Sequence, residues 1–208
     1  MFRDRLRVSI DQIGQALREP EAFALRWHRE GTPYGWLVFA ALASTAIAGT
    51  TFYGMTIGLP GKLPGMLLGG LRCTVAAGIA WSLPLPALYV LNSLSGSRLR
   101  PSTTLLAAQV TTSWGGLALM AAIPVSWFFT LALGSFSTIV LLVHLAVFTI
   151  VGVAMIDVFS RVMERLEPSR GRAPAIWLGL VGAIGAELFY AFGLFNFTPL
   201  WDWVSRTL

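Results

Sequence analysis

Charged residues are scarce in this sequence. Asp, Glu, Lys and Arg make up 12% of the 208 residues, whereas 55% are hydrophobic and the mean hydropathy is +0.69. Soluble domains carry about 25% charged residues, because charge keeps their surface in water. The shortage therefore predicts a protein that crosses a membrane several times rather than a soluble domain.

Cysteine and histidine are also nearly absent. Cys73 is the only cysteine, which excludes an internal disulfide and a cysteine-based metal cluster. The two histidines, His28 and His144, fall far apart in the expected topology. The sequence contains no H-E-x-x-H, no phosphate-binding Walker loop and no G-x-S-x-G. We therefore expect no metal, no other cofactor and no enzymatic activity.

Lysine is almost missing, yet the chain is basic. Lys62 is the only lysine among 15 basic residues, and the net charge is +5. A basic chain can bind nucleic acid, but basic residues also collect in the cytoplasmic loops of membrane proteins. The second explanation accounts for the excess, and we expect no nucleic-acid partner.

Long apolar runs fill most of the sequence. Each is near the ~20 residues that cross ~30 Å of hydrocarbon, and they cover residues 34–57, 66–94, 102–123, 136–159 and 175–197. Residues 124–135, interrupted by Pro124 and Gly134, are predicted to form an interfacial or re-entrant turn. The expected fold is all-α, a polytopic integral membrane protein with about five transmembrane helices.

The first 33 residues form a distinct amino-terminal segment. Apolar residues recur every three or four positions in residues 1–18, and Pro20 can open a second short helix. An arginine-rich amphipathic helix beside a span is typical of an interfacial helix bound to anionic headgroups. A helix packed on the protein's own cytoplasmic segments is the alternative. The predicted parts are a cytoplasmic segment (1–33), a transmembrane domain (34–199) and an exoplasmic tail (200–208).

The distribution of basic residues predicts the orientation. With five spans, residues 1–33 and the loops near Arg98 and Arg161 share one side and hold six, two and four basic residues, against Lys62 and Arg206 on the other. The amino terminus is therefore expected in the cytoplasm. Asp157 and Arg161 have the spacing of an ion pair on a solvated helix end. The predicted cytoplasmic basic face comprises Arg3, Arg5, Arg7, Arg98, Arg100, Arg165, Arg170 and Arg172.

Three ionisable residues fall inside apolar runs at similar depth. At a rise of ~1.5 Å per residue, Arg72 lies ~9 Å, His144 ~12 Å and Glu187 ~12 Å from the outer boundary. Charges inside a membrane usually face the protein and pair. We therefore predict a polar cluster in which Arg72 pairs with Glu187. Each also has a simpler explanation: Arg72 can extend to the headgroups, His144 can bond a hydroxyl or backbone group, and Glu187 can carry a proton.

Proline and glycine add two local predictions. Pro84 and Pro86 each remove a backbone donor and predict a kink in the second run, either a plain kink or one that lines a cavity. Gly65-x-x-x-Gly69 and Gly182-x-x-x-Ala186 match the small-residue pattern for close helix approach. We expect both to pack helices of the same chain.

The layout resembles the Yip1-type family of five-span membrane proteins, in its bacterial form. The similarity lies in "ALREPEAFALRWHREGTPYGWLVFAALAS", in "LPLPALYVLNSLSGSRLRPSTTLLAAQV" and in the orientation of the two ends. Eukaryotic relatives are non-enzymatic factors that bind small GTPases and shape vesicle traffic. Because the amino-terminal segment of this chain is short, the role of the eukaryotic relatives is not assigned to it directly. No functional residue of the family is matched to a position in this sequence.

Two functions agree with these observations. The resemblance and the missing catalytic motifs favour a non-enzymatic membrane scaffold or accessory subunit that recruits a membrane-protein partner, or a second copy, at its cytoplasmic face. The kinked second run and the residues Arg72, His144 and Glu187 favour a small transporter or channel component instead.

Overall fold

The computed structural model describes residues 11–30, 35–94, 96–97, 99–134, 137–168, 175–195, 197 and 205. Within these ranges all regular structure is helical, so the all-α prediction is confirmed. Residues 11–18 form a first short helix. It is followed by α2 (Pro20–Glu30), α3 (Gly35–Ile57), the 3-10 turn η1 (Leu59–Gly61), α4 (Lys62–Ser82), α5 (Leu85–Leu94), α6 (Pro101–Leu133), α7 (Thr138–Leu166) and α8 (Ala175–Ala191).

Four helical stretches are long and apolar enough to cross a membrane. They are Gly35–Ile57, Leu59–Val90, Pro101–Leu133 and Thr138–Leu166. α8 matches the fifth predicted run but has only 17 residues, or ~26 Å of helix. The chain is thus an all-α polytopic membrane protein in which α8 is shorter than the other membrane helices.

The turn predicted at residues 124–135 is not present. α6 continues through Pro124 and ends at Leu133, giving a helix of 33 residues. A proline removes one backbone donor, but neighbouring groups in a membrane protein compensate, and the helix continues. The chain reverses only after Gly134. The φ of this residue is 74°, a backbone conformation that glycine adopts without steric strain, and α7 begins after Ser137.

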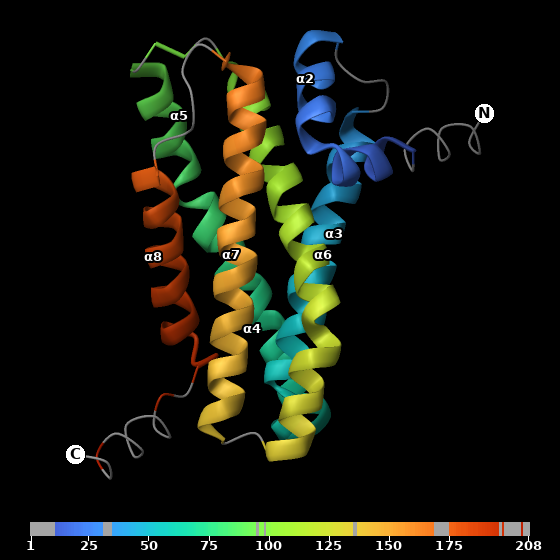
Figure 1. Ribbon diagram of the computed structural model, residues 1–208, viewed down its shortest axis with the longest axis vertical. Coiled ribbons are helices and arrows are strands. Elements are labelled where there is room, and N and C mark those ends of the chain that lie inside the picture. Colours follow the sequence, from blue (N-terminus) through green and yellow to red (C-terminus); the bar gives the residue numbers. More distant parts are fainter. Residues whose placement is uncertain are drawn as a thin grey trace.

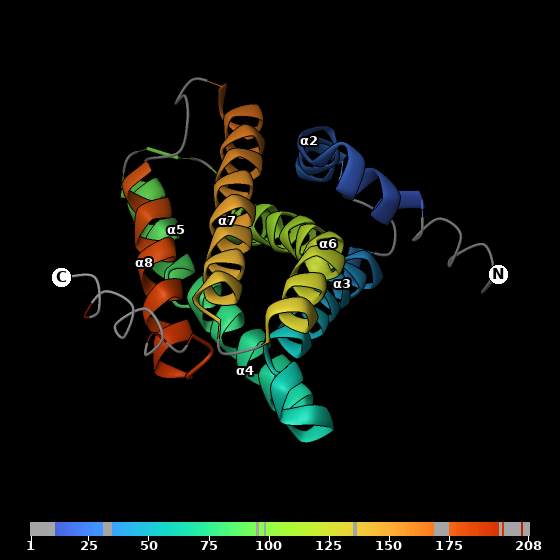
Figure 2. The ribbon, with the colours of Figure 1, turned by 60° about the horizontal axis from the view of Figure 1, so that its bottom comes forward.

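The long helices form an arc rather than a closed ring. α7 packs against α6, α6 against α3, α3 against α4, and α4 against α8. Figure 2 shows this order from the end of the bundle where α3 joins α4 and α6 joins α7, which we call the far end. α2 lies at the opposite end, the α2 end, together with the start of α6 and the end of α7 (Figure 1).

Glycines bring neighbouring helices into backbone contact. A Cβ on Gly49 of α3 would lie 2.2 Å from the carbonyl oxygen of Gly116 on α6. Between α3 and α4, a Cβ on Gly54 would lie 2.6 Å from the Gly69 oxygen, and one on Gly58 would lie 2.1 Å from the Gly65 oxygen. Side chains at these positions would push the helices apart, so the glycines determine which helices are neighbours. The Gly65–Gly69 pattern therefore packs helices of this chain, as predicted.

The second apolar run is interrupted where the prolines lie. α4 ends at Ser82, Leu83 and Pro84 form a turn, and α5 restarts at Leu85. Pro86 falls in the first turn of α5, where no intrahelical donor is lost. Pro84 is buried and Pro86 is exposed. The two prolines thus mark the junction between two helices rather than a bend within one.

The amino-terminal helices pack on their own chain. Ala16, Phe23 and Trp27 contact a cluster with Val38 of α3 and Leu106 of α6. The helices are amphipathic, as predicted, but within residues 11–30 their apolar side chains face the bundle, which is the alternative considered above. Residues 1–10 lie outside the described residues.

Polar contacts hold α2 in this position. A guanidinium nitrogen of Arg161 on α7 pairs with Glu21, and Arg161 Nε lies 3.0 Å from Asp157 Oδ2. The predicted Asp157–Arg161 pair is therefore confirmed. Two turns further along the same face of α2, His28 Nδ1 lies 3.2 Å from Thr103 Oγ1 of α6. α2 is thus connected to both α6 and α7.

Candidate functional site

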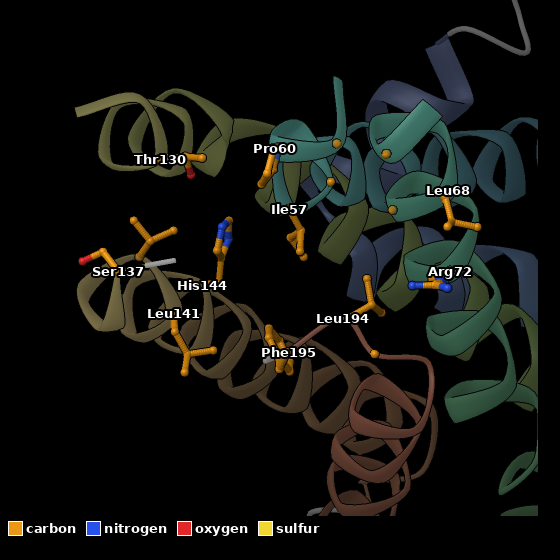
Figure 3. A pocket seen from close by; sticks show the side chains of 16 residues that line it. Ile57, Pro60, Leu68, Arg72, Thr130, Ser137, Leu141, His144, Leu194 and Phe195 are labelled. Atoms are coloured by element: carbon orange, nitrogen blue, oxygen red, sulfur yellow. The ribbon is translucent and has the colours of Figure 1, made fainter. Parts of the chain in front are cut away.

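A polar pocket of about 290 Å³ lies at the far end of the bundle. Its walls come from the end of α3, η1, the first half of α4, the last turns of α6, the start of α7 and the chain after α8. Figure 3 shows His144 and Ser137 on one wall, with Arg72 across the space from them. The lining residues are Ile57, Gly58, Pro60, Gly61, Gly65, Leu68, Gly69, Arg72, Thr130, Ser137, Val140, Leu141, His144, Gly193, Leu194 and Phe195.

His144 is part of a buried hydrogen-bond network. Its Nδ1 lies 2.9 Å from the Tyr53 hydroxyl, which also lies 3.0 Å from Ser126 Oγ. Tyr53 and Ser126 are fully buried and His144 is 5% exposed. The network joins α3, α6 and α7, and Tyr53 also makes edge-to-face contacts with the rings of His144 and Phe148. Each buried polar group thus has a partner, which apolar surroundings require.

Hydroxyl groups continue the polar wall beyond His144. Thr130 Oγ1 donates to the Ser126 carbonyl at 2.7 Å, one helical turn back along α6. Ser137 caps α7, with its Oγ accepting from the Ile139 N–H at 3.3 Å. Thr130 and Ser137 both line the pocket. A hydroxyl has one donor and two acceptor sites, so Ser137, whose oxygen accepts, still has its O–H to donate to a ligand, whereas Thr130 has already donated its own.

Arg72 supplies the positive charge of the pocket. It is half-buried on α4, ten residues after the helix begins, and its side chain extends toward the chain that follows α8. Its Nη1 lies 3.8 Å from the position of a Cβ on Gly193. Within the described residues the guanidinium has neither a hydrogen bond nor an ion pair. Arg72 and His144 therefore line one pocket, as the predicted depths suggest.

Glu187 does not belong to this pocket, and the predicted pair with Arg72 is wrong for this structure. Glu187 is exposed on α8, with Ala186 and Tyr190 exposed beside it, whereas Val181 and Gly185 of α8 are buried. Equal depth means that two residues lie at the same distance from the membrane boundary. It does not determine which side of each helix the side chain is on. α8 turns Glu187 away from α4.

Tyr53, Ser126 and Thr130 were not among the predicted site residues. Each is a hydroxyl-bearing residue inside an apolar run, and this is the sequence feature that could have indicated a polar site. Serine and threonine are frequent in membrane helices, where their hydroxyls bond the preceding turn, and several do so here. The pattern therefore does not separate pocket residues from others before the helices are placed.

A second cavity, of about 640 Å³, lies inside the arc of helices. Helices α3, α4, α6, α7 and α8 all contribute to its wall, which is mainly apolar. Its polar exceptions are Thr50, Thr74, Ser82, Gln109, Thr112 and Thr149. Trp81 of α4 lines it and packs against Phe159 of α7. Its size and lining are typical of sites for apolar ligands.

Phenylalanine rings stand where the two cavities meet. Phe195 lines both cavities, and its ring centroid lies 5.6 Å from that of Phe148 and 5.8 Å from that of Phe189. Phe148 and Phe189 are 4.6 Å apart and connect α7 to α8. The polar pocket and the apolar cavity thus share Phe195, which packs against the two rings that line the apolar cavity.

The predicted basic face is described only in part. Arg100 is exposed before α6 and Arg165 is exposed in the last turn of α7, both at the α2 end. The other predicted members, Arg3, Arg5, Arg7, Arg98, Arg170 and Arg172, lie outside the described residues. Residues 200–204 and 206–208 of the predicted tail lie outside them as well.

No metal site is apparent in the part of the chain that the structure describes, since no three His, Cys, Asp or Glu side chains come together there. Comparisons with protein-family models, with curated proteins and with solved structures find no match for this chain. The resemblance to the Yip1-type family therefore stays a prediction from sequence and layout.

Proposed function

We propose that this chain is a non-enzymatic integral membrane scaffold or accessory subunit that recruits a partner at the α2 end. The observation that carries the proposal is the attachment of α2 to α6 and α7 through Glu21–Arg161 and His28–Thr103. A helix fixed near both ends presents the residues of its other face in a constant arrangement. Preorganisation of this kind lowers the entropic cost of binding.

The exposed surface of this end is rich in charge. Arg26 and Arg29 are exposed on α2, and Arg18 is exposed just before it. In the topology predicted from the sequence, twelve of the 15 basic residues belong to the segments on the cytoplasmic side. The positive-inside rule supports a cytoplasmic location for this end, in a bacterial inner membrane. Positive potential would attract an acidic partner or anionic headgroups.

Site-specific photo-crosslinking in the native membrane tests the scaffold function. A crosslinker at position 26 or 29 is expected to yield a discrete protein adduct, while one at Lys62, an exposed cation at the far end, yields none. The double charge reversal Arg26→Glu with Arg29→Glu should abolish an adduct formed from position 18. Equal adducts from position 62, or none from α2, would contradict the proposal.

The polar pocket and the apolar cavity favour a second candidate, a small transporter or channel component. Arg72 and His144 line the first, and Gln109 and Thr112 line the second. In a Cys73→Ala background, cysteines at Thr130 and Thr112 can be treated with a membrane-impermeant thiol reagent. A transport pathway requires both positions to react, whereas a scaffold leaves position 112 protected.

A further inference from the structure

Among the residues that the structure describes, the lining of the polar pocket at the far end has positive charge but no acidic residue. Its 16 lining residues include Arg72 and His144 and neither Asp nor Glu. Glu187 is exposed on α8 and does not line the pocket. We infer that this pocket binds a phosphate group, carried by a lipid headgroup or by a small phosphate-bearing solute. This goes beyond the recruitment of a partner, which concerns the opposite end.

The arginine head is placed for such a ligand. Arg72 comes from α4, but its Nη1 reaches within 3.8 Å of where a Cβ of residue 193 would be. Gly193 has a φ of 65° and no side chain, so the space beside the guanidinium stays open. A guanidinium offers parallel N–H donors that match two phosphate oxygens, and it needs a counter-charge in apolar surroundings.

The opposite wall adds one hydroxyl donor, that of Ser137, because the O–H of Thr130 is already donated to the Ser126 carbonyl. Thr130 and Ser137 bring hydroxyls to the pocket, and α7 begins at Ser137 with its first N–H groups at this end. The start of a helix carries partial positive charge and supports an anion placed near it. Figure 3 shows Arg72 and these residues on two sides of one space. Arg72 would therefore make the direct contact with an anion, and the start of α7 would add positive potential from the other side.

Size and position limit what the ligand can be. A volume of about 290 Å³ admits a headgroup or a small solute, but it is at the small end for a whole ligand pocket. The lining includes η1 and Ser137, which belong to the chain reversals at the far end. That is the level of lipid headgroups. Acyl chains of a bound lipid would stay outside, along the exposed apolar residues of α4 such as Leu67 and Leu71.

Thermal unfolding of the purified full chain in mild detergent tests this inference. The probes are inorganic phosphate, a short-chain phosphatidylglycerol and a short-chain diacylglycerol that lacks phosphate. We expect at least one phosphate-bearing probe to raise the Tm in a saturable way and the diacylglycerol to leave it unchanged. Arg72→Gln should weaken the apparent affinity about tenfold or more, because a charge-assisted hydrogen bond is lost. Lys62→Gln, a matched loss of an exposed cation outside the lining, should bind as the wild type does.

A second variant keeps the test decisive if Arg72→Gln does not fold. Gly61 lines the pocket at its rim, is exposed, and has a φ of −79° with no atom within 4 Å of an added Cβ. Gly61→Asp therefore fits sterically and leaves Arg72 in place. Its carboxylate should repel the ligand or occupy the guanidinium, and weaken binding severalfold. Gly61→Ala is the control and should bind normally.

The outcomes separate the sources of the phosphate. Stabilisation by phosphatidylglycerol alone assigns the pocket to a lipid headgroup, and equal stabilisation by inorganic phosphate assigns it to a free anion. The inference is overturned if neither probe raises the Tm, if diacylglycerol does so equally, or if Gly61→Asp and every folded Arg72 variant bind as the wild type does.

Discussion

Tyr53 and His144 are 91 residues apart in the chain, yet the hydroxyl of one lies 2.9 Å from Nδ1 of the other. The same hydroxyl lies 3.0 Å from Ser126 Oγ, so a single oxygen connects α3, α6 and α7. The contact lies one turn before the end of α3, beside the pocket that His144 lines. The network therefore fixes the wall of the pocket as well as the far end of the bundle.

Removing that oxygen should weaken the bundle. Tyr53→Phe keeps the ring and its packing but leaves His144 and Ser126 without their shared partner. Hydrogen bonds between membrane helices contribute ~0.6 kcal/mol on average and up to ~1.7 kcal/mol, and we expect a loss near the upper value because three groups are affected. Denaturant unfolding in detergent measures it. A double-mutant cycle with His144→Gln should show coupling of about 0.5 kcal/mol or more, and strictly additive losses would show that the bond contributes nothing.

The glycine contacts predict opposite effects for the same substitution. Gly49→Ala adds a methyl group 2.2 Å from the Gly116 oxygen, so α3 and α6 must separate. We expect the free energy of unfolding to fall by about 1–3 kcal/mol, the usual cost of overpacking. Gly78→Ala is the matched control, because no atom lies within 4 Å of its added Cβ. That variant should be neutral or slightly stabilised through helix propensity. Equal losses for both would contradict the close approach.

The Arg161–Glu21 pair should control how firmly α2 is attached. Glu21→Gln removes the charge that binds α2 to α7, while Asp157→Asn removes only the neighbour of Arg161 on its own helix. Global stability should change by less than ~1 kcal/mol in either variant, because the Arg161 side chain is 47% exposed. Hydrogen exchange of residues 20–30 should accelerate in Glu21→Gln and stay unchanged in Asp157→Asn. Unchanged exchange in both would mean that the apolar contacts of Phe23 alone hold the helix.

The sequence predicts where the helices lie along the chain better than it predicts which side of each helix faces the bundle. Hydropathy placed four of the membrane helices, and the helical rise placed Arg72 and His144 at one level. Sequence reasoning did not show which side of α8 carries Glu187, because apolar residues surround this carboxylate on all sides of the helix. The rotation of α8 about its own axis depends on contacts such as that of Gly185 with Ala80 of α4. The periodic signal that reveals a buried face in a soluble helix is absent when lipid surrounds it.

Two other differences have the same kind of cause. Pro124 was interpreted as the end of a helix, although a membrane helix tolerates a proline when the surrounding groups compensate. The amphipathic pattern of residues 11–30 predicted an apolar face, but the pattern is the same whether that face meets lipid or another helix. The deciding fact is the fit of Ala16 and Phe23 against α3 and α6, which only the folded arrangement provides.

The exposed position of Glu187 leads to a last prediction. Glu187→Gln should leave the unfolding free energy of the purified protein unchanged within ~0.5 kcal/mol, as for a surface substitution away from any contact. Its effects should also add to those of Arg72→Gln within the same margin, because residues without a shared partner act independently. Ser126→Ala is the control and should be destabilising, since that hydroxyl is buried and bonded. Coupling of 1 kcal/mol or more between Arg72 and Glu187 would show that the two residues do pair in solution. Additivity would show that the two residues act independently, as their separate positions on α4 and α8 imply.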